Sequence, residues 1–362
     1  MSKPVVKEMY YIRVIACLSV VMIHAITMVT GNFELPEKTI AFYRTIQMLL
    51  LFATPIFILI SEFLLAYSYP NQVPKGFFKK RFMFILIPYL SMSVIYALVD
   101  KVISGPSILG ILKLIYKHIF LASWHGYFIL IIFQFYILHY IFVKFLQKTP
   151  ASIVLSVTFI INAGYLYFFT FVPPLEGINH FWYDNSRLPF LGWLFYFSLA
   201  YYCGRYIQGF RILLNKYKYW VGAFLFSSAS YVLYLYFSGT LTWVSSKRFD
   251  MLFYTVAVFL SLFYTCQRIK HLPKPVLFLS KYSFAIYLLH PMVQYFLNLF
   301  LPDTIHIGLY TVLVFSTGVA GSIFLAYVIH RLPLGHFFVG KINPAQLSTS
   351  DKIKKRKRTL PA

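Results

Sequence analysis

Long apolar segments alternate along the chain with short polar connections. The apolar segments run approximately over residues 10–30, 42–68, 82–100, 125–143, 151–172, 188–208, 219–238, 250–268, 282–300 and 307–330. Each is about 17–27 residues long, the length that an α-helix needs to cross a hydrocarbon core of roughly 30 Å. The pattern therefore predicts an all-α, polytopic membrane bundle of about ten transmembrane helices.

Composition supports a lipid bilayer as the environment. Of the 362 residues, 59% are hydrophobic and 12% are charged, whereas a soluble domain has about 25% charged residues. No polar connection is long enough to fold alone, including the longest near 173–187. We expect one transmembrane domain over residues 1–340, with any chemistry inside the bundle.

The charges predict an orientation. The formal net charge is +23. With the N-terminus placed inside, most of the 33 basic residues fall on inner connections and most of the ten acidic residues on outer ones. This positive-inside pattern predicts cytoplasmic N- and C-termini and argues against nucleic acid as a partner. Residues 341–362, which contain KIKKRKR, are predicted to form a basic cytoplasmic tail drawn to anionic lipid headgroups.

One further segment, 105–124, is too short and too punctuated to be an obvious span. Its apolar residues recur at helical spacing, which favours an amphipathic helix at the outer surface, with a re-entrant segment as the alternative. The three cysteines, Cys17, Cys203 and Cys266, lie in apolar runs without metal-ligand spacing. We interpret them as packing residues and predict no metal site.

The first apolar segment carries Arg13 and His24. Eleven residues apart, they project from nearly the same helical face and lie roughly 16 Å apart along the axis. Ionisable groups within a membrane helix are costly and usually face a bundle interior or a wet cavity. The alternatives are an arginine that extends to the interface and a neutral, hydrogen-bonded histidine. Histidine is also the side chain best suited to general base catalysis near neutral pH.

Charged groups also mark the next two segments. Glu62 lies at a depth similar to Arg13, and because a buried carboxylate needs a partner, we predict an Arg13–Glu62 pair. Lys79, Lys80 and Arg81 precede the third segment at its inner end. They are either ordinary positive-inside charges or a site that attracts phosphates.

Polar residues recur in two later segments. His125 and Gln134 lie in the fourth, where each alone is a weak signal. In the ninth, Ser283, Tyr287 and His290 follow at i, i+4 and i+7 and therefore share one helical face, just before Pro291. This stripe indicates a wet interior cavity or, alternatively, satisfied polar packing.

Several of these motifs occur in an order that resembles the membrane-bound acyltransferase-3 family. They are the R-x10-H pattern of Arg13 and His24, IPY at 87–89 after the basic cluster, SWHGYF at 123–128 and SFAIYLLHP at 283–291. The resemblance covers essentially the whole chain. The stretches WHGYFILIIFQFYIL and FLGWLFYFSLAYYCG are most similar to family members of poly-N-acetylglucosamine biofilm systems.

The chain departs from the family at one point. Members often carry a second arginine a few residues after the basic cluster, where this sequence has Phe84 and Ile85. The resemblance implies a contact to a donor phosphate there. Lys79 and Lys80 are candidates to replace it as point charges.

The resemblance implies an integral O-acyltransferase of a bacterial cytoplasmic membrane. Its co-substrate would be cytoplasmic acyl-CoA, acetyl or succinyl, with the phosphates held by Arg13, Lys79, Lys80 and Arg81. The acceptor would be a hydroxyl of a cell-surface or exported carbohydrate.

Within that framework, His24 is the expected general base, and Tyr287 and His290 would orient the acceptor or stabilise the oxyanion. Glu62, His125, Gln134 and Ser283 would support the site. A competing hypothesis is an exporter of a poly-N-acetylglucosamine-type exopolysaccharide. A third is a flippase or a scaffold subunit for a polysaccharide synthase.

Overall fold

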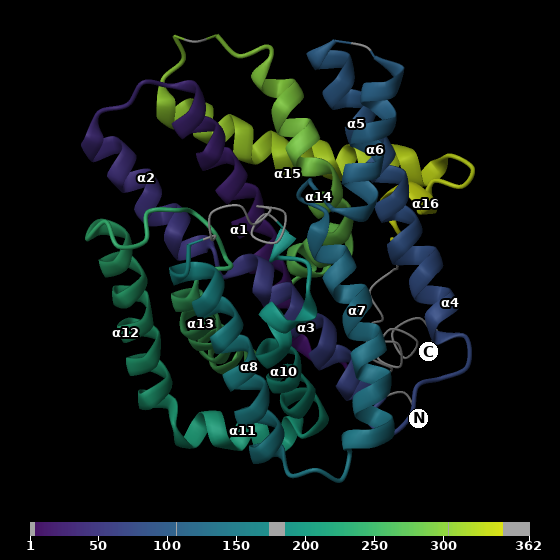
Figure 1. Ribbon diagram of the computed structural model, residues 1–362, viewed down its shortest axis with the longest axis vertical. Helices are drawn as coiled ribbons and strands as arrows, with labels where there is room; N and C mark the ends of the chain where they lie inside the picture. Colours follow the sequence, from purple (N-terminus) through teal and green to yellow (C-terminus); the bar gives the residue numbers. More distant parts are fainter. Residues whose placement is uncertain (1–3, 106, 174–184, 303, 343–362) are drawn as a thin grey trace, which may run out of the picture.

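The computed structural model describes residues 4–105, 107–173, 185–302 and 304–342, and all regular structure in these ranges is helical (Figure 1). The helices are α1 (Lys7–Asn32), α2 (Glu37–Leu50), α3 (Ala53–Ser68), α4 (Phe77–Arg81), η1 (Phe82–Leu86), α5 (Ile87–Ser104), α6 (Ile108–Phe120), α7 (Tyr127–Ile141), η2 (Phe142–Leu146), α8 (Ala151–Phe171), η3 (Phe190–Trp193), α10 (Leu194–Arg205), α11 (Ile207–Lys216), α12 (Lys218–Phe237), α13 (Phe249–Gln267), α14 (Lys274–Asn298), α15 (Ile307–Arg331) and α16 (His336–Val339).

Within the described residues, nine helical stretches have the length and apolar character of membrane spans. They coincide with nine of the ten predicted segments, so the predicted all-α, multi-pass bundle is confirmed. The predicted basic tail lies almost entirely outside the described residues, and its start at residue 341 stays a prediction.

The predicted segment 188–208 is not one continuous helix. It consists of the 3₁₀ turn η3 and the twelve-residue α10, and the chain leaves helical geometry at Tyr206 (φ −113°, ψ 42°) before α11 begins. Alone, α10 rises only about 18 Å, which is shorter than the hydrocarbon core. It is nevertheless buried against α3, with Phe197 and Ala200 fully covered. The segment is therefore a short internal element of the bundle.

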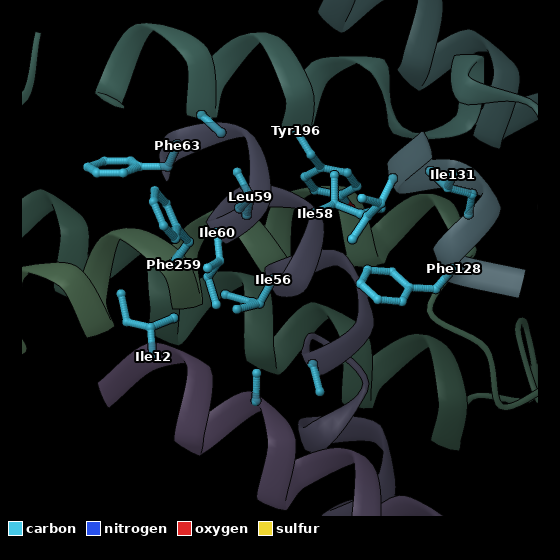
Figure 2. Packing of buried hydrophobic residues seen from close by; sticks show 14 of the residues in the cluster. Ile12, Ile56, Ile58, Leu59, Ile60, Phe63, Phe128, Ile131, Tyr196 and Phe259 are labelled. Atoms are coloured by element: carbon cyan, nitrogen blue, oxygen red, sulfur yellow. The ribbon is translucent and has the colours of Figure 1, made fainter. Parts of the chain in front are cut away.

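The central element of the core is α3. Ile56, Leu59 and Phe63 on this helix are fully buried, as expected for a helix that is apolar nearly all round. Figure 2 shows them enclosed by side chains that include Ile12 of α1 and Phe259 of α13. Elements far apart in sequence are thus fixed around one helix, while α12 and α5 lie at opposite edges (Figure 1).

Two prolines shape the helices that border the site. Pro55 has no N–H to donate to the carbonyl of Leu51, and the long stretch Glu37–Ser68 turns at this point between α2 and α3. Pro88 likewise removes a donor, and the π-helical turn η1 directly precedes it. Neither proline ends the helical stretch in which it lies.

Side-chain contacts tie the helix ends together in the predicted alternation. At one end, Lys7 of α1 donates to the carbonyl of Lys270 after α13 (2.8 Å). At the opposite end of the same helix, Asn32 donates to Asn298 of α14 (2.8 Å). The connection after α13 therefore lies at the end of the bundle where α1 begins, and the end of α14 lies at the opposite end.

The segment 105–124 contains the helix α6, as predicted. It packs on α5, with His118 buried and Ile108, Leu109 and Leu112 exposed. The amphipathic helix is confirmed, and its placement at a membrane surface stays a prediction.

Candidate active site

Three histidines from separate parts of the chain meet in the bundle. His24 lies on α1, His125 directly precedes α7, and His290 lies on α14. The ring centroids are 5.0 Å apart for His24 and His290, 5.5 Å for His125 and His290, and 6.2 Å for His24 and His125. The sequence selected each residue singly, and the fold assembles them into one histidine cluster (His24, His125 and His290).

Pro291 explains how two of these imidazoles are held. It has no N–H, so the carbonyl of Tyr287 loses its helical donor. The Nε2 of His125 (3.1 Å) and the Nδ1 of His290 (3.0 Å) lie against this carbonyl, and His290 Nδ1 is also 2.9 Å from the carbonyl of Ile286. Because a carbonyl only accepts hydrogen bonds, both nitrogens must carry a proton.

This arrangement fixes the chemistry of His290. With Nδ1 protonated, the Nε2 of a neutral imidazole keeps its lone pair and can accept a proton. That Nε2 is buried and has no hydrogen-bond partner among the described residues. His24 is only partly buried and lies beside it. Both histidines can therefore take part in proton transfer.

A residue that sequence reasoning missed, Tyr96 of α5, contacts the backbone of α14 next to Pro291. Its hydroxyl donates to the carbonyl of Leu288 (2.9 Å), and the N–H of Met292 donates to the same hydroxyl (3.3 Å). In an unbroken helix these two backbone groups would bond directly. Tyr96 thus bonds to both backbone groups beside His290. As one of 30 tyrosines, it gave no sequence signal.

Tyr287 and His125 hold each other. The Tyr287 hydroxyl donates to the backbone carbonyl of His125, while the His125 Nε2 donates to the backbone carbonyl of Tyr287. The Tyr287 hydroxyl is therefore engaged with the backbone. Its predicted contact with acceptor or oxyanion would require exchange of this bond and stays a prediction.

A cavity of about 750 Å³ approaches the histidine cluster from the basic end of the bundle. Its lining on α14 extends from Leu277 to Tyr287, ten residues, a rise of about 15 Å. Phe57 and Phe128 line it together with Tyr287 at the deep end. The volume falls within the usual range of small-molecule sites, about 300–1,000 Å³.

The cavity collects most of the predicted phosphate-binding residues. Arg13, Lys80 and Arg81 line it, and so do Lys281 and Lys341, which sequence reasoning did not select. The described lining residues include no carboxylate. The cavity is therefore strongly positive and suited to an anionic ligand.

Lys79, which was also predicted to bind phosphate, does not line the cavity. It is exposed. Successive residues on a helix point about 100° apart, so adjacent Lys79 and Lys80 face different surroundings.

The two arginines of the cavity have free hydrogen-bonding capacity. The Arg81 guanidinium stacks over Phe77 (5.0 Å) and Tyr136 (5.2 Å), and its buried Nε has no hydrogen-bond partner in the described part of the chain. None of the ion pairs among the described residues involves Arg13 or Arg81. Guanidinium groups in this state suit bidentate binding of phosphate.

The predicted Arg13–Glu62 pair is wrong. Glu62 instead bonds the Nδ1 of His139 on α7 at 2.6 Å, and both side chains are fully buried. The neighbouring Ser61 lines the cavity while Glu62 does not, because the two point about 100° apart on α3. Glu62 thus supports the packing of α3 on α7 rather than the cavity.

Two other predicted supporting residues have local partners. The Gln134 amide donates to the carbonyl of Leu188 (2.8 Å) and accepts from the N–H of Phe190 (3.1 Å), so it fixes the chain before α10. The Ser283 hydroxyl donates to the carbonyl of Ser280 (3.0 Å) and lines the cavity. Only Ser283 is placed to meet a cavity ligand.

Comparison with known proteins bears on the chemistry of this site. A family model described as an acyltransferase domain, Acyl_transf_3, matches residues 6–331. The chain is 38% identical, over 96% of its length and 98% of the relative's, to the "Putative membrane-bound acyltransferase YfiQ" of Bacillus subtilis (strain 168).

Two further relatives carry the name "Probable poly-beta-1,6-N-acetyl-D-glucosamine export protein". One, from Staphylococcus aureus (strain MRSA252), is 29% identical over 79% of this chain and 81% of its own length. The other, from Staphylococcus epidermidis, is 30% identical over 91% of this chain and 94% of its own. No solved structure is significantly similar to the chain.

Proposed function

The chain belongs to the acyltransferase-3 family of multi-pass membrane proteins, and from this we propose that it moves an acetyl or succinyl group from cytoplasmic acyl-CoA to a hydroxyl of a cell-surface or exported carbohydrate. The relatives named for poly-N-acetylglucosamine export support a carbohydrate as acceptor.

One observation carries the proposal. A single cavity connects a set of unpaired cations to Tyr287, whose ring contacts the histidine cluster. Acyl-CoA has the matching polarity, because its phosphates are anionic and its thioester is neutral. Phosphates bound near Lys80 and Arg81 would direct the thioester toward Tyr287, beside His24 and His290. Holding both reactants in such a geometry is itself a large part of catalysis.

The transfer requires a proton acceptor and later a proton donor. We propose that the imidazole of His24 takes the proton of the carbohydrate hydroxyl as that oxygen attacks the thioester carbonyl. The tetrahedral intermediate then collapses, the carbon–sulfur bond breaks, and the thiolate takes the proton back from the imidazolium. The products are the O-acyl carbohydrate and free CoA. General base catalysis of this kind contributes about 10²–10⁴-fold.

Purified full-length protein tests the proposal directly. It is incubated in nanodiscs with acetyl-CoA or succinyl-CoA and N-acetylglucosamine oligomers, and mass spectrometry follows the oligomers while a thiol reagent follows CoA. We expect ester formation with matching thiol release, lost in His24→Ala and retained in His271→Ala. His271 is an exposed histidine outside the cavity. Thiol release that is unchanged in His24→Ala would contradict the proposed role of His24.

The alternative function is export of the polysaccharide itself, which the names of two relatives favour. Export and acylation differ in what the cell surface shows. If the protein is an exporter, an inactive variant loses the surface polymer. If it is an acyltransferase, an inactive variant keeps the polymer and loses its esters.

A further inference from the structure

The deep end of the cavity is formed by three aromatic rings. Phe57 comes from α3, Phe128 from α7 and Tyr287 from α14. Their centroids are 5.7 Å apart for Phe57 and Phe128, 5.2 Å for Phe128 and Tyr287, and 6.4 Å for Phe57 and Tyr287. These residues form the three-ring cluster (Phe57, Phe128 and Tyr287).

Tyr287 joins the three-ring cluster to the histidines. Tyr287 lines the cavity and also contacts His125, with ring centroids 5.5 Å apart. His24, His125 and His290 are themselves not part of the cavity lining. An acyl group delivered along the cavity therefore meets the three rings before it reaches a histidine.

Lys281 and Arg13 lie well away from this end of the cavity. Lys281 precedes Tyr287 by six residues on α14, a rise of about 9 Å. Side chains on a helix tilt toward its N-terminus, which directs Lys281 further from the rings. Its ammonium group lies over Tyr282, 5.4 Å from the ring centroid.

Arg13 is also distant from the rings. It precedes His24 by eleven residues on α1, a rise of about 16 Å, whereas Tyr287 precedes His290 by only three, about 4.5 Å. Since His24 and His290 lie side by side, Arg13 is about 12 Å from the level of Tyr287 along the bundle. A short acyl chain seated at the rings cannot span that distance.

A carboxylate at this position would be poorly accommodated. The described residues at the deep end, Phe57, Phe128 and Tyr287, offer it aromatic rings and no cation. Removing a carboxylate from water without an opposite charge is strongly unfavourable. A small, uncharged acyl group, in contrast, gains from apolar contact with the rings.

We propose that the three-ring cluster selects a short, uncharged acyl group, so that this protein transfers acetyl rather than succinyl. This inference rests on the proposed acyltransferase function. It assigns Phe57, Phe128 and Tyr287 as specificity-determining residues for the donor.

The test compares donors on one preparation. Full-length protein in nanodiscs receives acetyl-CoA, butyryl-CoA or succinyl-CoA with the same N-acetylglucosamine oligomers, and kcat/KM is measured for each. We expect acetyl to exceed succinyl by about tenfold or more, the scale on which pocket fit discriminates substrates. Equal or better use of succinyl-CoA would overturn the selection while leaving the acyltransferase function intact.

Two variants, Phe57→Ala and the milder Phe57→Leu, distinguish selection by the size of the acyl group from selection by its charge. Phe57 is only partly buried and borders the cavity, so shortening it enlarges the acyl seat. We expect a rise in butyryl relative to acetyl transfer and continued poor use of succinyl. Equal gains for butyryl and succinyl would refute exclusion by charge. Phe226→Ala, which truncates a 76% exposed side chain on α12, is the matched control and keeps the acetyl preference.

Cells provide a readout that does not depend on the chosen acceptor. Surface glycans from cells with and without the gene are analysed for ester type by mass spectrometry. Loss of acetyl esters supports the inference, and loss of succinyl esters overturns it. If no ester depends on the protein, the proposed function fails and the inference with it.

Discussion

The imidazole rings of His24 and His290 lie edge to face with centroids 5.0 Å apart, although they come from opposite ends of the chain. His290 is held by two backbone carbonyls through Nδ1, and its unpartnered Nε2 remains able to accept a proton. His24 is thus not an isolated base. The two rings are in contact, so a proton-transfer role of one is expected to depend on the other.

The first prediction concerns this pair. We expect His24→Ala and His290→Ala each to lower kcat by about 10²–10⁴-fold, because both disable the same proton transfer. The double variant should lose little more than either single variant, since residues that act as a unit are not additive. The measurement is acetyl transfer by purified protein with an unchanged unfolding temperature. Fully multiplicative losses would show that the two histidines act independently.

Tyr96→Phe should disturb the backbone of α14 beside His290. The change removes the hydroxyl that satisfies the carbonyl of Leu288 and the N–H of Met292. Leaving a buried polar group unpaired costs about 1–3 kcal/mol, so we expect a lower unfolding temperature together with lower kcat. Tyr231→Phe, at a 42% exposed position on α12, should change neither. Normal stability and kcat in Tyr96→Phe would exclude this positioning role.

The cavity arginines should act on donor binding. We expect Arg13→Ala and Arg81→Ala to raise KM for acyl-CoA about tenfold or more, because hydrogen bonds to charged groups are worth about 1.5–3 kcal/mol. Substitution by lysine should restore KM only in part, since lysine lacks the bidentate fork. Lys79→Ala, outside the cavity lining, is the control. If it raised KM as much as Arg81→Ala, a diffuse surface charge would explain donor binding instead.

Changes to the Glu62–His139 pair should lower the stability of the protein without changing its KM for acyl-CoA. Removing one partner of a buried pair costs about 3–5 kcal/mol, whereas replacing both by apolar residues is often tolerated. We expect Glu62→Leu and His139→Leu to lower the unfolding temperature strongly and the double variant to recover much of it. The KM for acyl-CoA should remain near that of the unaltered protein. A Glu62→Gln change that raised this KM as Arg13→Ala does would restore the link between Glu62 and Arg13.

Hydropathy alone predicted the nine span-length helical stretches of the described residues, because the cost of exposing polar backbone to lipid dictates their length. It could not show that the chain leaves helical geometry at Tyr206, which makes α10 short. The depth of a side chain in the membrane could also be predicted, because its position in the span gives its distance along the helix axis. The sequence did not show which neighbouring helix each side chain faces. For this reason Glu62 was paired with Arg13 instead of His139.

The sequence also did not identify cavity residues that come from distant parts of the chain. Lys281 and Lys341 line the cavity because α16 packs against both α14 and η1, and the Lys341 ammonium group lies 5.4 Å from the ring centroid of Phe84 in η1. His24 and His290 were singled out because titratable groups are rare within apolar segments. Their mutual contact, and its dependence on Pro291, required the packed structure.

The most direct test of the central claim is ester analysis of the surface glycans in cells that carry unaltered protein, His24→Ala or His271→Ala. For an acyltransferase, we predict that the unaltered protein and His271→Ala keep the ester. His24→Ala should lose it while the polymer still reaches the surface. An unchanged ester content in His24→Ala, with secretion stopped, would contradict acyl transfer and establish export instead.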